Sequence, residues 1–318
     1  MRIFVSTLVS VCLMGALDAA AQLRLPRTPY AEGYTLAADV TDAARPTIAQ
    51  PGTEEQTPRP TQQQLWLRNT TLITGGALLI GAYGMNKWWD DGFAGGFRKQ
   101  DEGWFGQSTQ YGGADKIGHA WGSYAGARLF SQGFEVIGNE PATAQALGFL
   151  SAFGIMAGVE VVDGYSRKYR FSKEDAIMDL VGAGLGYLME RNPEIDRLLD
   201  FRLLYRKSAG SPWAPAGDYS GQTYLLVAKA AGVPALRQHD VLRYVELAVG
   251  YGTRGYDDPL GAKGARNLYY GISLNLSEVL GQTVFRGARE RSRTQRATDL
   301  FLEFIQVPGT AALADHRL

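Results

Sequence analysis

The 318-residue chain has one cysteine, Cys12, which lies in an apolar N-terminal stretch. Residues 1–21 have the pattern of a secretory signal peptide, with Arg2 at the start, an apolar core and small residues from Ala19 to Ala21. Removal of this signal leaves no thiol, which excludes disulfides, a cysteine nucleophile and cysteine metal ligands from the mature chain. The sequence predicts an exported protein of the periplasm or the cell-envelope membrane, with the outer membrane among the candidates.

The chain also lacks net charge, because 32 lysines and arginines balance 32 aspartates and glutamates. This balance gives no global field that attracts nucleic acid, so no nucleic-acid partner is expected. The G-x-S-x-G elbow, the P-loop and the H-E-x-x-H motif are missing as well. Histidine is scarce and occurs only as His119, His239 and His316. Any chemistry must therefore come from side chains that the fold places together.

Glycine is abundant, with 39 residues, and many glycines lie in apolar stretches of helical length. Before these stretches, residues 22–64 are rich in proline, threonine and glutamine, which predicts a flexible segment. Four helices are predicted over residues 65–89, 114–131, 141–162 and 172–191, with a shorter helical piece over 194–205. Together they predict a four- to five-helix Gly/Ala-rich bundle that occupies residues 65–206. Residues 141–162 are apolar enough to span a membrane and suit the centre of a bundle equally well.

Beyond residue 207 the pattern changes to an alternation with a period of two, which is typical of strands with one apolar face. Strands are predicted over residues 223–228, 244–254, 268–276 and 300–307. About four strands are too few for a self-contained outer-membrane barrel, which needs at least ~8. Residues 207–318 therefore predict a small C-terminal antiparallel β-sheet, either packed on the helices or resting on a membrane. The predicted fold class is α+β.

Acidic residues interrupt the apolar helices in pairs that share a helix face, and one pair includes a histidine. The pairs are Asp115 with His119, Glu160 with Asp163, and Asp175 with Asp179. A charge inside an apolar helix is costly unless it finds a partner. The simplest bundle therefore gathers these acids around His119, with Lys116 and Arg167 as counter-ions.

This group of residues has three interpretations. In the first, His119 is a general acid or base oriented by Asp115 or Glu160; the candidate catalytic residues are His119, Asp115, Glu160 and Asp179, and the candidate substrate-binding residues are Lys116 and Arg167. In the second, the group holds a divalent metal; the candidate ligands are Asp115, His119, Glu160 and Asp163. In the third, it is a structural polar network, which satisfies the same demand for pairing.

Three pieces of the chain carry a family resemblance: residues 113–119 (GADKIGH), 160–164 (EVVDG) and 171–176 (FSKEDA). With Asp179 and Gly182 they resemble the YfiM-like family of predicted periplasmic lipoproteins, a bacterial family of unknown function. The resemblance covers about residues 104–193 and implies an exported protein without an assigned reaction. A lipidated cysteine of the family has no counterpart here. The same order of motifs is also similar to that of VanZ-like membrane proteins, whose helices sit in the bilayer.

A looser resemblance concerns residues 117–120 (IGHA) and 166–167 (SR), followed by Asp175, Asp179 and Gly182. These residues resemble motifs of the type 2 phosphatidic acid phosphatases, in which a histidine attacks phosphorus and a Ser-Arg pair grips phosphate. Lys173 stands at the spacing of the second histidine of that pattern, and the first motif of those enzymes is not visible.

Two functions follow from these observations. The first is a membrane-associated structural or assembly role in the envelope, in which the acids and His119 hold the helices together and the partner is membrane lipid or an envelope protein. The second is a hydrolase of a phosphorylated lipid or envelope glycan, with His119 central, the acids orienting it or binding metal, and Arg167 gripping the phosphate. An enzyme needs His119 beside a pocket that solvent reaches, whereas a structural network can be sealed.

Overall fold

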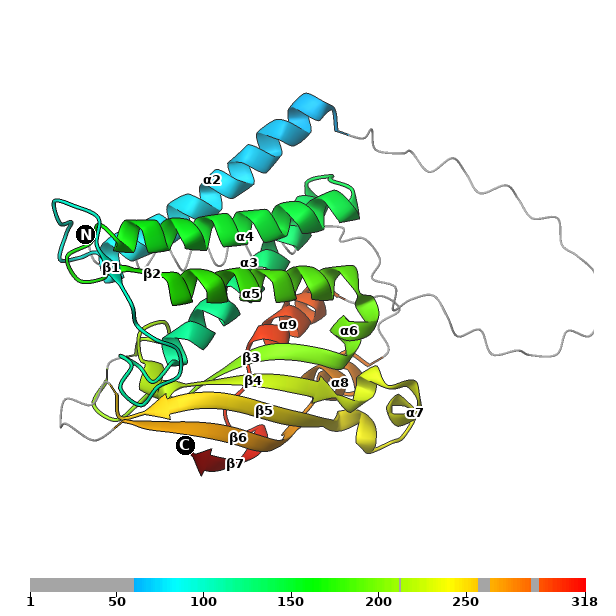
Figure 1. Ribbon diagram of the computed structural model, residues 1–318. Helices are drawn as coiled ribbons and strands as arrows, with labels where there is room; N and C mark the ends of the chain where they lie inside the picture. The colour runs from blue at the N-terminus through cyan, green and yellow to red at the C-terminus, as the bar shows by residue number, and fades with distance from the viewer. Residues whose placement is uncertain (1–59, 212, 257–263, 287–291) are drawn as a thin grey trace, which may run out of the picture.

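The computed structural model describes residues 60–211, 213–256, 264–286 and 292–318 (Figure 1). The predicted signal peptide and residues 22–59 of the predicted flexible segment lie outside the described residues. A group of helices lies along one edge of an antiparallel sheet, and this arrangement confirms the α+β fold class.

The helical part is built around α3, on which α4 and α5 pack. Its helices are α2 (Gln62–Lys87), α3 (Ala114–Val136), α4 (Pro141–Asp163), α5 (Lys173–Arg191) and α6 (Pro193–Leu198). The four long helices confirm the four predicted ones. Ser172 caps α5, because its hydroxyl accepts a hydrogen bond of 3.2 Å from the Asp175 amide. The short strand β2 (Phe171–Ser172), just before α5, pairs in parallel with β1 (Lys99–Gln100), which precedes α3.

The sheet contains five strands in the order β3-β4-β5-β6-β7, and every neighbouring pair is antiparallel. The strands are β3 (Leu199–Tyr205), β4 (Gln222–Lys229), β5 (Val245–Arg254), β6 (Ala265–Leu274) and β7 (Ala311–Arg317). Between them lie η2 (Tyr219–Gly221), η3 (Ala230–Gly232), α7 (Pro234–Arg237), η4 (Leu242–Tyr244), α8 (Leu276–Gln282) and α9 (Arg293–Phe304). β4, β5 and β6 confirm three of the predicted strands.

The sheet curls, and the chain after α9 contacts β3 at one edge and the end of β6 on the other side. Ile305 forms a parallel bridge with Leu203 of β3, and the Gln306 amide donates to the Leu203 carbonyl over 3.0 Å. A few residues later, the Thr310 carbonyl accepts from the Leu274 amide of β6 over 2.9 Å. Side chains from all five strands meet inside the curl, and they are Leu204, Leu225, Val227, Ala248, Tyr269 and Leu313.

Both faces of the sheet carry large apolar residues, unlike an ordinary water-soluble sheet, in which the exposed face is polar. On the inner side of the curl, Arg202 and Glu246 are buried, with exposures of 6% and 0%. On the outer side, neighbouring strands align large apolar residues, such as Val249 between Leu226 and Tyr270. We call this surface the outer apolar face; its residues, 40% to 61% exposed, are Leu226, Leu247, Val249, Leu268, Tyr270, Ile272 and Leu274.

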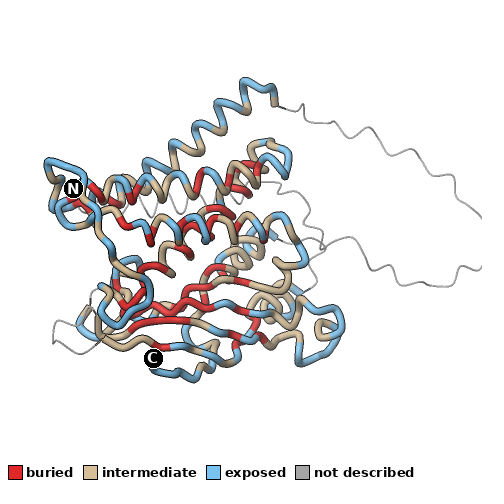
Figure 2. Tube along the Cα trace, in the orientation of Figure 1, coloured by how far each residue is buried: buried red, intermediate tan, exposed pale blue. Residues whose placement is uncertain are grey.

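The helices also expose apolar surface. In α2 the only buried residue is Gly84, and Figure 2 shows α2 almost entirely in the colours of exposed and intermediate residues. α4 is long and apolar enough to cross a membrane by length and composition, and only 28% of its most apolar stretch is buried. Outward-facing apolar residues of α4 and α5 are between 45% and 57% exposed: Leu150, Val161, Ile177, Leu180, Val181 and Leu188.

Two secondary-structure predictions are wrong. The helical piece predicted over residues 194–205 ends at Leu198, and β3 follows because residues 199–205 pair with β4 along their whole length. The strand predicted over residues 300–307 is helical as far as Phe304. Ser292 caps this helix by accepting from the Gln295 amide over 3.1 Å, a Ser-x-x-Gln start signal that outweighs the short apolar alternation. β7 was not predicted.

Candidate functional site

Three helices bring most of the predicted site residues into one buried group, which we call the His119 cluster. α3 contributes residues near its start, α4 residues of its last turn, and α5 residues of its first two turns. Glu102, from the loop after β1, completes the group through Lys116. The members are Glu102, Asp115, Lys116, His119, Ser123, Glu160, Asp163, Ser172, Glu174, Asp175 and Asp179.

Glycines allow this close assembly. Gly113 precedes α3 with a φ of 87°, a left-handed conformation that glycine adopts without strain. Gly182 of α5 lies so close to α3 that a Cβ atom there would overlap the backbone carbonyl of Ala120. This contact places Asp179, one turn before Gly182, beside His119.

His119 lies between two buried carboxylates. Its Nδ1 is 3.2 Å from Asp179 Oδ1, and the Ser123 hydroxyl donates to the same oxygen over 2.9 Å. Its Nε2 is 3.7 Å from Glu160 Oε1, which is too long for a hydrogen bond. Asp179 therefore orients the imidazole, where Asp115 or Glu160 was expected. The His119 side chain remains 18% exposed, so its edge is within reach of solvent.

Lys116 forms the second centre of the cluster. This lysine is only 1% exposed, and its Nζ pairs with Asp115 Oδ2 at 2.8 Å and with Asp175 Oδ1 at 3.0 Å. It also pairs with Glu102. Asp115 is thus occupied by Lys116 rather than by His119, although both neighbours lie on α3.

Hydrogen bonds tie the end of α4 to its surroundings. The backbone amide of Ser172 donates to Glu160 Oε2 over 3.2 Å, which fixes the carboxylate of Glu160 against the start of α5. The indole of Trp89 donates to Asp163 Oδ1. Trp89, in the segment after α2, therefore holds Asp163 at the C-terminal end of α4.

The cluster carries more acids than bases, and this excess shifts the pKa values. Burial raises the pKa of Glu160 to about 8, with help from the charge of Asp175. Burial likewise raises the pKa of Glu102 to about 7 and that of Asp163 to about 6. Burial lowers the pKa of His119, but the hydrogen bond and charge of Asp179, with the other nearby carboxylates, raise it to about 10. His119 is therefore a cation at neutral pH, which suits a counter-ion better than a general base.

One predicted site residue lies elsewhere, and several cluster members were not predicted as site residues. Arg167 lies on the exposed turn after α4, where its Nε donates to the Phe93 carbonyl over 3.1 Å. Glu102 comes from a loop without any periodic pattern, so the sequence carries no signal for it. Glu174 is 1% exposed, and its position in the acidic first turn of α5 was the one feature of the sequence that could have indicated its place in the cluster.

A second buried network, which the sequence analysis did not predict, joins the helices to the C-terminal part of the chain. Arg128 of α3 is 3% exposed and contacts three carboxylates from three other helices. Its nitrogens lie 3.0 Å from Glu190, 2.6 Å from Asp196 and 2.6 Å from Glu303. Burial, assisted by the charges of nearby acids, raises the pKa of Glu303 to about 8.

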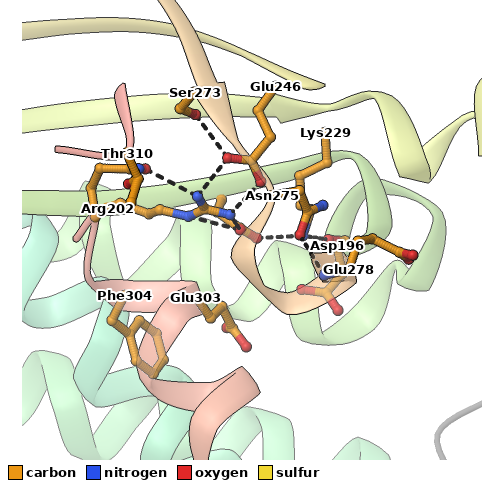
Figure 3. Close-up of polar contacts among 12 residues, drawn as sticks. Asp196, Arg202, Lys229, Glu246, Ser273, Asn275, Glu278, Glu303, Phe304 and Thr310 are labelled. Atoms are coloured by element: carbon orange, nitrogen blue, oxygen red, sulfur yellow. Dashed lines mark hydrogen bonds and ion pairs between the residues drawn. The ribbon is translucent and has the colours of Figure 1, made fainter. Parts of the chain in front are cut away.

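A third network lies inside the curled sheet (Figure 3). Arg202 donates to both carboxylate oxygens of Glu246, over 2.8 and 2.9 Å, and also pairs with Asp200. The Ser273 hydroxyl donates to Glu246 over 2.8 Å, and Lys229 pairs with Asp200. These partners satisfy the charges that the inner side of the sheet buries.

A cavity of ≈ 380 Å³ lies beside the strands of the sheet. Its lining includes Leu204, Thr223, Arg254, Tyr269 and Leu313 and no member of the His119 cluster. This cavity is therefore not the solvent-filled pocket beside His119 that a hydrolase requires.

Residues 101–191 match the family model described as "Predicted periplasmic lipoprotein (DUF2279)". The match spans the helices that carry the His119 cluster, and it confirms the resemblance to a family of predicted periplasmic lipoproteins of unknown function. It also agrees with the exported, periplasmic or envelope-associated location that the N-terminal sequence predicts. No curated protein and no solved structure matches the chain.

Proposed function

We propose that this exported envelope protein acts on a membrane as a structural or assembly factor without a catalytic step. The observation that carries the proposal is the outer apolar face of the sheet. Contiguous apolar surface of this kind marks an interaction site, because water-soluble proteins rarely expose it. The inner side of the same sheet buries the Arg202–Glu246 pair together with an apolar cluster, so the outer apolar face is additional apolar surface that the fold itself leaves uncovered.

We take membrane lipid, rather than one partner protein, as the occupant of this surface. The apolar exposure is not confined to the sheet, since α4 and α5 also turn large aliphatic side chains outward. One lipid phase can contact such separate elements, whereas a protein partner would have to be shaped to each of them. The apolar length of α4 points the same way.

In this proposal the His119 cluster holds α3, α4 and α5 together. Two observations favour this role over the hydrolase. Arg167, which was expected to grip phosphate, lies on an exposed turn and donates to the Phe93 carbonyl. The raised pKa of His119, about 10, keeps the imidazole charged and paired with Asp179 at neutral pH.

The test is flotation of the full chain with vesicles of phosphatidylethanolamine and phosphatidylglycerol. Leu247 and Ile272 face each other across β5 and β6, so the double variant Leu247→Lys with Ile272→Glu places opposite charges in register and spares the fold. Because fully burying one such side chain is worth about 1.5–3 kcal/mol, we expect this variant to bind vesicles at least roughly tenfold more weakly.

The matched control is the double variant Val241→Lys with Val284→Glu, at positions that are 64% and 68% exposed and lie outside the sheet. We expect it to float like the original chain. Equal flotation of both double variants would mean that the outer apolar face does not bind the membrane. Failure of the original chain to float would contradict the membrane role itself.

A further inference from the structure

The His119 cluster contains a donor set suited to a metal ion. One ligand atom each from His119, Glu160 and Asp175 lies within 4.8 Å of the others. The distance of 3.7 Å between His119 Nε2 and Glu160 Oε1 is too long for a hydrogen bond. Two atoms bound ~2.1 Å from a common zinc ion at open tetrahedral angles are ~3.4–3.7 Å apart, close to that separation.

The other side of the imidazole has the partner that metal-binding histidines use. A ligating histidine commonly donates its second ring N–H to a carboxylate, which fixes the orientation of the ring. His119 Nδ1 faces Asp179 Oδ1 at 3.2 Å, and Ser123 steadies that oxygen from 2.9 Å. This arrangement leaves Nε2 directed toward Glu160.

Buried oxygens in the cluster lack partners of their own. Asp179 has no exposed surface, and its Oδ2 forms no hydrogen bond. Asp115, which is 6% exposed, likewise leaves Oδ1 without a hydrogen bond. Because the side chain of Asp179 points at His119, its unpaired oxygen lies in the cluster and adds to a local excess of negative charge.

Lys116 neutralises part of this excess negative charge, on the side of the cluster away from Glu160 and Asp179. The acids Glu102, Asp115 and Asp175 form a second set with convergent oxygens, and the ammonium group of Lys116 pairs with each of them. Within the set of His119, Glu160 and Asp175, Lys116 pairs only with Asp175 Oδ1, at 3.0 Å. A divalent cation that displaces the proton from Nε2 would add one positive charge to this set, and the 18% exposure of the His119 side chain gives it access.

We propose that His119, Glu160 and Asp175 bind a divalent transition-metal ion of the Zn²⁺ type, with Asp179 as the residue that positions the imidazole. This differs from the sequence-based ligand set, in which Asp115 and Asp163 took the place of Asp175. The Trp89 indole donates to Asp163, and the carboxylate of Asp115 converges with Glu102 and Asp175 rather than with His119 and Glu160. The imidazole nitrogen favours Zn²⁺ over Mg²⁺ and Ca²⁺, which prefer oxygen ligands.

The experiment titrates ZnCl₂ into the full chain in detergent after treatment with a chelator, and follows binding by calorimetry. We expect one high-affinity zinc ion per chain, which MgCl₂ and CaCl₂ do not replace. His119→Gln and Glu160→Gln should abolish high-affinity binding. Asp179→Asn keeps all three ligands and should weaken binding by about 10- to 100-fold, as expected for loss of a positioning carboxylate.

His239→Gln is the matched control, because His239 lies on an exposed loop, and it should bind zinc like the original chain. Co²⁺ offers a second readout, since its visible absorption bands report ligation by His119 and should vanish in His119→Gln. If His119→Gln does not fold, Glu160→Gln decides the question. The proposal is overturned if the original chain takes up no stoichiometric zinc, or if Glu160→Gln and every folded His119 variant bind it unchanged. The proposed membrane role does not depend on this result.

Discussion

Arg128 shows how a buried charge is accommodated in this chain, through several ion pairs with acids of other helices. One guanidinium serves three carboxylates, from Glu190, Asp196 and Glu303, and each of these belongs to a different helix. A buried ion needs partners of good geometry, and here the partners exceed the charge that one arginine neutralises. Burial and the neighbouring acids therefore raise the pKa of Glu303 to about 8, so that it keeps its proton at neutral pH.

This pKa predicts a pH dependence of stability. An ordinary glutamate has a pKa of 4.5, so between pH 4.5 and about 8 the folded chain holds a proton on Glu303 that the unfolded chain releases. Stability should therefore fall as the pH rises through this window, by up to about 1.4 kcal/mol per pH unit from this group. Glu303→Gln should flatten the decline when urea unfolding is measured from pH 5 to pH 8.

Glu194→Gln is the control for this series, because the Glu194 side chain is 80% exposed and pairs only at the surface with Arg197. It should leave the pH profile unchanged. A profile of Glu303→Gln that parallels the original chain over the whole range would show that Glu303 is ionised in the fold.

The helical acids and His119 of the His119 cluster could be found from the sequence, but their pairing could not. Glu160 and Asp179 stand out because each interrupts an apolar helix, which is a strong signal. The partner that orients His119 comes from α5, however, and helix-face reasoning compares only residues of one helix. That choice depends on how closely α5 approaches α3 at Gly182, which no spacing in the sequence specifies.

At the scale of elements, α5 is asymmetric because its glycines have two different roles. Gly182 and Gly186 face α3, where a Cβ atom would meet the backbone oxygens of Ala120 and Tyr124. Gly184 lies on the same helix, and a Cβ atom added there would have no neighbouring atom within 4 Å. The first two glycines permit close helix packing, whereas the third has no packing partner.

This contrast predicts opposite effects of one substitution on one helix. Gly182→Ala should destabilise the fold by about 1–3 kcal/mol, because the added methyl forces α5 away from α3. Gly184→Ala should be neutral or stabilising by up to about 1 kcal/mol, since alanine is the better helix former. Thermal unfolding of the two variants measures both effects. Equal stability of the two variants would mean that α5 does not approach α3 at Gly182.

Among the strands, the alternation predicted the position of β5 and β6 but not which face is buried. Period two is the same whichever side faces water, and the usual expectation buries the apolar set. Here the opposite side of β5 is buried because Arg202 donates to Glu246, and the side-chain oxygen of Gln306 accepts from the same guanidinium. Those partners come from β3 and from the chain after α9, which lie far from β5 in sequence.

At the scale of the whole molecule, the helical part and the sheet share one core. Tyr124 of α3 and Met189 of α5, both fully buried, pack with Phe304 at the end of α9 and with Phe201 of β3. The Trp121 indole donates to the Phe304 carbonyl over 3.3 Å. The sequence-based boundary at residues 206/207 falls next to β3, which follows the helices without a linker and already belongs to the sheet. We therefore expect the two parts to unfold together.

Phe304→Ala tests this cooperativity, because Phe304 is 7% exposed and contacts both parts. Loss of a buried phenylalanine costs about 3–5 kcal/mol, whereas Phe301→Ala, at a position on α9 that is 55% exposed, should cost about 0.5 kcal/mol. Hydrogen exchange of the α3 and β5 amides provides separate readouts for the two parts. If the core is shared, Phe304→Ala should accelerate exchange in α3 and β5 by the same factor, because both then exchange through one global opening. Faster exchange in β5 alone would instead mean that the helices form a unit that folds without the sheet.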